Sequence, residues 1–342
     1  GTRSHCYPGV NQMILPVLQP PQETPASYRL SMHTSYFLDL YESGFRNFAG
    51  IHLDGADLRS RILVGVNLPC ANLTGARLER SFLTKANFAY AQLNWVDLSF
   101  AKLSASNLNH ADLTKANLRG SFLVNADLRG ARLSGANLSH ANLRNACLRG
   151  ANLCGANLCG ANLRGADLCD TNLAWAHLGG ARLSGAAIDK TRMDAVNLEG
   201  AWLNGIDLSS LDLSGVNLRE AKLNGAKLDQ TNLSMANLSR ATLREASLLG
   251  ADLSSCNMSS AVLWHARLNG ANLTRCDLTK ANLAGACLDH AIVDGTEFTE
   301  TVLPRSARQY LLKAVTGTTR WTQRSSRETL AESEFIEQHR QG

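Results

Sequence analysis

This sequence of 342 residues has few aromatic residues, no long apolar run and only a small net charge. Apolar residues make up 44% but aromatics only 6%, and Ala and Leu dominate the apolar fraction. This composition suits a narrow interior filled many times by the same two side chains. No apolar run approaches the roughly 18 residues that a membrane-spanning helix needs, so we expect a soluble chain. The net charge of +5 excludes a polyelectrolyte.

Proline is also scarce outside the N-terminal end. Residues 1–30 hold five of the seven prolines (Pro8, Pro16, Pro20, Pro21 and Pro25) and show no periodicity, which predicts an extended arm. We expect an N-terminal helical cap over residues 31–47, in which Thr34 or Ser35 caps a short helix that ends at Gly44. This helix would cover the first turn of whatever follows.

A five-residue repeat fills most of the chain. From Leu53 to Leu303 every fifth residue is Leu or a close substitute, which gives 51 consecutive units without insertion or deletion. Two residues before these there is a small residue in most units, and it is Ala in 33 of the 51. A strict period of five matches neither an α-helix nor a strand. It indicates a chain that turns a corner every five residues, with the Leu and the small residue inward and the other three positions in solvent.

The repeat resembles the pentapeptide-repeat family, whose pattern is a small residue, Asn or Asp, Leu or Phe, and two variable positions. Residues 141–165 show it well: ANLRNACLRGANLCGANLCGANLRG. The resemblance implies an all-β fold, a right-handed quadrilateral β-helix with four units per coil. For residues 48–305 it implies about 13 coils and a rod ~60 Å long. Residues 38–48 are similar to the helical cap of cyanobacterial members.

After Pro304 the pattern becomes helical, and we expect a C-terminal helical cap and tail over residues 306–342. Ala307, Tyr310, Leu311 and Ala314 would form an apolar stripe that ends before Gly317. Ser325 and Glu328 have the spacing of a capping box, which predicts a second helix. We expect this second helix either to dock on a partner or to fray.

One side of the β-helix is a candidate protein-binding face. Residues 20 apart lie on the same side if a coil holds four units. We call one such set of outward positions the apolar column: Ile62, Phe82, Lys102, Phe122, Asn142, Asn162, Arg182, Trp202, Lys222, Thr242, Val262, Asn282 and Val302. The corresponding positions on the other sides are almost all polar, and Val64, Val124 and Trp264 add to this side. Exposed apolar groups gathered on one side often mark a binding surface.

Two weaker candidates lie elsewhere. Trp95 and Trp175 stand at corners of a neighbouring side. Arg119, Arg144 and Arg164 belong to a girdle of arginines that spreads over several sides, and nearby Asp residues favour a solvated surface over a binding site.

Neither a metal site nor a catalytic site is expected. Cys256 and Cys276 occupy the small inward position, whereas Cys147, Cys154, Cys159 and Cys169 should point outward on different sides, too far apart for a metal. The histidines form no constellation with a nucleophile and a carboxylate, and a rod without insertions lacks a concave pocket. We therefore expect no enzyme, no cofactor and no small-molecule substrate.

Three residues depart from the pattern at inward positions. Arg61 occupies an inward position in the first coils, so we expect its guanidinium to reach the end of the rod or to pair with another group. Ile206 and Leu211 are large residues where Ala is normal, so we expect the β-helix to swell or bend there.

Two functions remain open. The first is a scaffold that binds proteins of a larger complex, and the cyanobacterial type of cap indicates a photosynthetic or membrane-associated one. The compartment would be the cytoplasm or a plastid, either the stroma or the thylakoid. The second is the activity best known in the family, DNA mimicry that targets gyrase. It requires dense negative charge, yet residues 54–305 hold 25 Lys and Arg against 22 Asp and Glu. That balance favours the scaffold, and it is too weak for us to expect a nucleic-acid partner.

Overall fold

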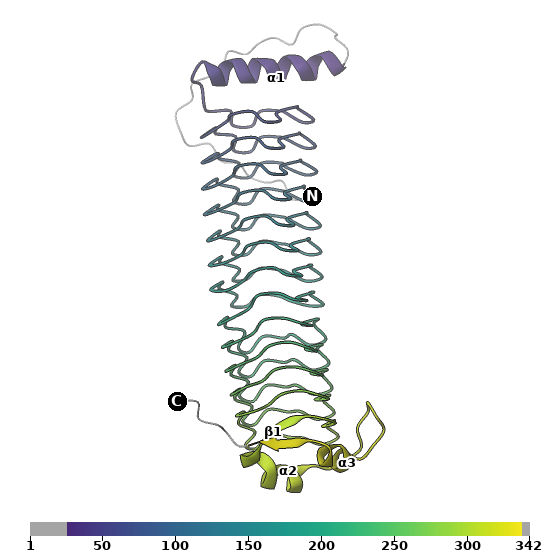
Figure 1. The fold of residues 1–342 in the computed structure, drawn as a ribbon. Coiled ribbons are helices and arrows are strands. Elements are labelled where there is room, and N and C mark those ends of the chain that lie inside the picture. Colours follow the sequence, from purple (N-terminus) through teal and green to yellow (C-terminus); the bar gives the residue numbers. More distant parts are fainter. Residues whose placement is uncertain (1–25, 337–342) are drawn as a thin grey trace.

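The computed structural model describes residues 26–336, and side chains from residue 34 onward. Most of them form one column of stacked coils (Figure 1). Parallel β-bridges join residues 20 apart, from Asn47–Asn67 to Asn282–Val302, so each coil takes four five-residue units. The fold is therefore a four-sided β-helix. We call its sides A, B, C and D; they begin with units 46–50, 51–55, 56–60 and 61–65, and each continues with the units 20 residues further on.

The repeat pattern follows from the hydrogen bonds of a single unit. The amide of the central Leu donates to the next coil, as from Leu128 to the carbonyl oxygen of Cys147 at 2.7 Å. The preceding Asn or Asp accepts from the amide two residues later, as Asp112 Oδ1 does from Thr114 at 3.0 Å. The fifth residue turns the corner at positive φ, which suits glycine: Gly55 has φ +67°.

The interior is filled as the sequence predicts. The central leucines are fully buried almost without exception, and the alanines two residues before them are at most 8% exposed. All but one of the hydroxyl residues that replace Ala donate to a backbone carbonyl oxygen in the interior; Ser121 is the exception within residues 26–336. Thr171 Oγ1 bonds the carbonyl oxygen of Leu148 at 2.9 Å, for example.

Helix α1 (Ala26–Glu42) lies across the first coil (Figure 1). It begins directly after the last proline of the arm, so residues 26–30 are helical and the prediction of an extended arm over 1–30 was wrong there. Thr34 and Ser35 lie inside the helix and do not cap it. Phe37 packs against Phe48 with ring centroids 4.6 Å apart. The arm's residues 1–25 lie outside the described residues.

The C-terminal segment closes the other end (Figure 1). Strand β1 (Val302–Pro304) is followed by the 3-10 helix η1 (Arg305–Ala307), helix α2 (Arg308–Ala314) and helix α3 (Ser326–Ala331). The capping box at Ser325 is present. Strand β2 (Glu334–Ile336) pairs in parallel with β1, and Leu330 is buried at 2% exposure. The segment up to Ile336 is thus part of the fold, and the prediction that it docks on a partner or frays was wrong.

Arg61 does not point inward. Its side chain is exposed, because unit 61–65 is the first on side D and no earlier coil covers it. Burial of an unpaired guanidinium would be costly, so the side chain turns into solvent.

The coils part at Ile206 and Leu211, as expected. Ile206 is buried and Leu211 half-buried, and among residues 26–336 no bridge joins Ala187 to Asp207 or Arg192 to Asp212. Sides C and D keep their bridges in these coils, at Asn197–Asn217 and Trp202–Lys222. A cleft of about 400 Å³ opens on side A, lined by Ala187, Asp207 and Leu211 among others. The two large side chains hold the coils apart on sides A and B only.

Candidate docking surface

The apolar column lies on side D. Every neighbouring pair in it is joined by a bridge, from Ile62–Phe82 to Asn282–Val302, so its outward side chains stack coil upon coil. The fold places all eight main candidate residues on this side, because Val64, Val124 and Trp264 follow the central residues of side D units.

The exposed apolar groups of side D form three islands and not one continuous patch. The first contains Ile62, Val64, Phe82, Phe122 and Val124; Ile62 is 68% exposed and Phe122 38%. Trp202 is 44% exposed and lies four coils, roughly 19 Å, beyond Phe122. Val262 and Trp264 follow three coils later. Val124 and Val262 are half-buried, so they contribute less exposed surface than the other side chains of the islands.

Cations stand over the rings of two islands. Lys102 Nζ lies 3.3 Å from the centroid of the Phe122 ring, and the guanidinium carbon of Arg244 lies 4.6 Å from that of Trp264. These contacts are cation–π interactions. Beside these cations Phe122 is still 38% and Trp264 41% exposed.

Side D is the positively charged side of the β-helix, with a net charge of +8 (9 − 1) against −5 (16 − 21) on the other three sides together. Its units from 61–65 to 301–305 contain a single carboxylate, Glu245, and strand β2 adds Glu334 at the tip. The same units contain nine cationic residues: Arg61, Lys85, Lys102, Arg144, Arg164, Arg182, Lys222, Arg244 and Arg305. Sides A, B and C together hold 21 of the 22 Asp and Glu of residues 54–305 and 16 of the 25 Lys and Arg.

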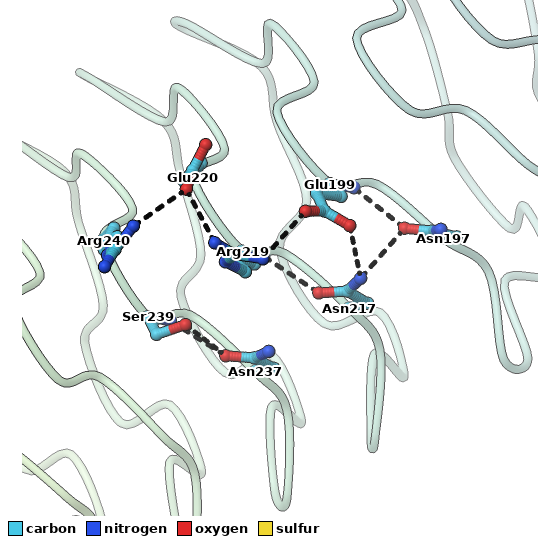
Figure 2. A network of polar contacts seen from close by, with 8 residues as sticks. All are labelled: Asn197, Glu199, Asn217, Arg219, Glu220, Asn237, Ser239 and Arg240. Carbon is cyan, nitrogen blue, oxygen red and sulfur yellow. Dashed lines mark hydrogen bonds and ion pairs between the residues drawn. The ribbon is translucent and has the colours of Figure 1, made fainter.

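The sides also differ in whether their charged residues form ion pairs. Figure 2 shows side C, where Arg219 reaches Glu199 at 3.3 Å and Glu220 at 3.1 Å, and Arg240 reaches Glu220 at 3.5 Å. On side D, Arg144, Arg164 and Arg182 occupy three successive coils, all exposed. Within residues 26–336 these three arginines make no ion pair. The charge of these three arginines is therefore available to a partner.

The weaker candidate residues lie on different sides of the β-helix. Trp95 and Trp175 are 61% and 65% exposed and share the corner between sides B and C, four coils apart; Lys115 Nζ lies 4.4 Å from the Trp95 ring. Arg144 and Arg164 belong to side D. Arg119 lies on side C, where its guanidinium is 6.0 Å from the Phe100 ring.

The sequence reasoning missed two features. It counted charge over the whole rod, although sorting the residues by a period of 20 separates nine cations on one side. It also passed over Tyr90 and Phe100, exposed corner residues of the same coil as Trp95. Tyr90 stacks on His110 at 5.1 Å between ring centroids.

Contrary to the prediction, the outward cysteines do not all lie on different sides: Cys147 and Cys169 belong to successive coils of side A, while Cys154 lies on side B and Cys159 on side C. Cys256 and Cys276 are fully buried with their Sγ atoms 3.0 Å apart, and burial raises the pKa of Cys276. Cys169 does not lie in solvent as predicted, since it is only 7% exposed; Arg149 of the previous coil forms ion pairs with Asp167 and Asp170 beside it. Burial likewise raises the pKa of Cys169. In the described part of the chain no three His, Cys, Asp or Glu residues are placed to hold a metal ion.

Comparison with known proteins identifies the family. The model described as "Pentapeptide repeats (8 copies)" matches repeatedly within residues 51–185 and 191–295. HetL, a protein involved in heterocyst differentiation regulation from the cyanobacterium Nostoc, is 34% identical over 77% of this chain and 95% of HetL, with a TM-score of 0.32. A search of curated proteins found no match. The chain belongs to the pentapeptide-repeat family, and its β-helix is right-handed.

Two further solved structures are similar over part of the chain. A pentapeptide repeat protein of the Arabidopsis thaliana thylakoid lumen is 33% identical over 38% of this chain and 90% of its own, with a TM-score of 0.25. QnrB1, a plasmid-mediated fluoroquinolone resistance protein, is 17% identical over 71% of this chain and 91% of its own, with a TM-score of 0.33. None of the helices within residues 26–336 has the length and apolar character to span a bilayer.

Proposed function

We propose that this protein is a non-catalytic scaffold whose rigid rod docks through side D on a larger assembly. The observation that carries the proposal is the alignment of the exposed apolar islands on a single side of an uninterrupted β-helix. Aromatic residues and arginine are the types enriched in protein interfaces, and side D combines both. The rod would have about 13 coils, with α1 capping one end and α2 and α3 the other.

The setting of this assembly is part of the proposal. HetL comes from a cyanobacterium, and the Arabidopsis relative from the thylakoid lumen. Both support a photosynthetic or membrane-associated complex, in the cytoplasm or a plastid. DNA mimicry is not favoured, because a mimic needs a continuous negative surface and sides A, B and C mix both signs of charge.

A native pull-down from the source organism tests the scaffold function. The variant Phe82→Glu, Phe122→Glu, Trp202→Glu charges two residues of the first island and Trp202, near the middle of side D. All three side chains are exposed, so circular dichroism and melting should match the wild type while partner binding is lost.

The matched control places the same three charges at corners of other sides, as Tyr90→Glu, Trp95→Glu, Trp175→Glu. Retention of the partner by the control and its loss from the side D variant support the proposal. Retention by both variants would rule side D out as the interface, and recovery of gyrase by both would restore the DNA-mimic function.

A further inference from the structure

Side D combines exposed apolar groups with positive charge, and its eight cations from Arg61 to Arg244 make no ion pair within residues 26–336. Its units from 61–65 to 301–305 contain nine cationic residues and a single carboxylate. The ion pairs of the β-helix lie on sides A, B and C. The charge is a property of this side and not of the whole rod.

The extent of the charge indicates an extended partner. Unpaired cations run from Arg61 to Arg244, which are nine coils apart and hence roughly 43 Å. An ordinary protein interface covers about 800 Å² on each partner, a patch of roughly 28 Å by 28 Å. One globular protein would leave much of this charge uncovered.

The groups of side D form one continuous row. The parallel bridges keep its side chains in register from coil to coil, also where the coils part on sides A and B. A lipid surface contacts all of them, and it accommodates exposed Trp, Phe and Ile at the level of its headgroups.

A nucleic acid fits this surface less well. The phosphate backbone offers nothing to the exposed side chains of Ile62 and Val64. Stacking of bases on aromatic rings needs free ring faces, and Lys102 and Arg244 lie over the rings of Phe122 and Trp264.

We propose that side D docks on an anionic lipid surface, with the cations at the headgroups and the apolar islands at the boundary of the acyl region. The inference rests on the proposed docking function of side D and names the surface that it contacts. Each cation near an anionic membrane contributes about a fivefold increase in partitioning, and this contribution is screened by salt.

Co-sedimentation of the full chain with vesicles tests the inference. The probes are vesicles of phosphatidylcholine alone and of phosphatidylcholine with roughly one third phosphatidylglycerol. We expect binding to the anionic vesicles only, weakened by 1 M salt, at which the Debye length is about 3 Å. The variant Arg144→Gln, Arg164→Gln, Arg182→Gln should lower the partition coefficient about 100-fold.

The matched control removes three cations that lie outside side D, as Lys115→Gln, Lys190→Gln, Arg267→Gln, and should bind like the wild type. Equal binding of both variants would overturn the inference, as would equal binding to both kinds of vesicle or none. Tighter binding to a 20-base-pair DNA duplex than to anionic vesicles would assign side D to nucleic acid and also overturn it. A partner recovered in the pull-down together with no vesicle binding would remove the lipid inference and leave the scaffold function standing.

Discussion

Replacement of Leu211 by Thr should close one of the two gaps between the coils. Leu211 is half-buried at a position where the coils before and after it carry Thr191 and Thr231. The hydroxyl of Thr191 donates to the carbonyl oxygen of Leu168 at 2.7 Å, and that of Thr231 to Leu208 at 2.8 Å. In the variant we expect the new hydroxyl to donate to the carbonyl of Ile188 in the same way.

The backbone ladder on side B should recover with it. In the wild type no bridge joins Arg192 to Asp212, whereas two coils later the amide of Asp252 donates to Thr231 at 3.0 Å and that of Leu233 to Asp252 at 2.7 Å. Two restored backbone bonds and one new side-chain bond are worth roughly 1 kcal/mol each. The loss of a half-buried Leu costs about 1 kcal/mol. The net gain in local stability is then about 2 kcal/mol.

Native-state hydrogen exchange measures this gain directly. A gain of about 2 kcal/mol should slow exchange of the Met193 and Asp212 amides roughly 30-fold. The control Leu213→Thr lies in the same unit at a fully buried central position, and it should cost at least about 2 kcal/mol. Unchanged or faster exchange at Met193 and Asp212 in Leu211→Thr would refute the claim that Leu211 holds the coils apart.

Two further predictions concern the C-terminal segment. At Gly317 (φ +78°) a Cβ would lie 2.9 Å from Asp294 Oδ1 and 3.1 Å from the Gly295 nitrogen, so Gly317→Ala should cost about 2 kcal/mol in denaturant unfolding; Gly55→Ala, with open space at φ +67°, should cost only about 1. Burial alone would raise the pKa of Glu297, but hydrogen bonds from Thr299 and Thr322 outweigh it and lower that pKa. The stability that Glu297 provides is therefore complete above its unfolded pKa of about 4.3 and lost as the pH falls through the folded value. Trp321 fluorescence should report this loss below about pH 4, and Glu297→Gln should abolish the transition.

The coil architecture could be predicted from the sequence because the signal is repeated. Each unit places a small residue and a Leu inward, and 51 units in one register leave no alternative period. The 20-residue register then assigns every outward residue to a side, which is why the sequence alone predicts that the apolar column lies on one side of the rod.

The ends and the exceptions could not be predicted in the same way, because they depend on contacts that no repeat encodes. The length of α1 and the pairing of β2 with β1 are set by packing against the terminal coils. Cys169 is 7% exposed at a position of the unit where most residues are more exposed. The charge of side D was present in the sequence, but the net charge of the rod concealed it.

Hydroxyl-radical footprinting of the bound protein tests the central claim, that side D is the docking surface, most directly. The chain carries its own internal control, because Trp202 and Trp264 lie on side D while Trp95 and Trp175 lie at the corner between sides B and C. On binding to the assembly or to anionic vesicles, oxidation of Trp202, Phe82 and Phe122 should fall while that of Trp95 and Trp175 stays unchanged. Protection of Trp95 and Trp175, with side D oxidised as in the free protein, would contradict the account.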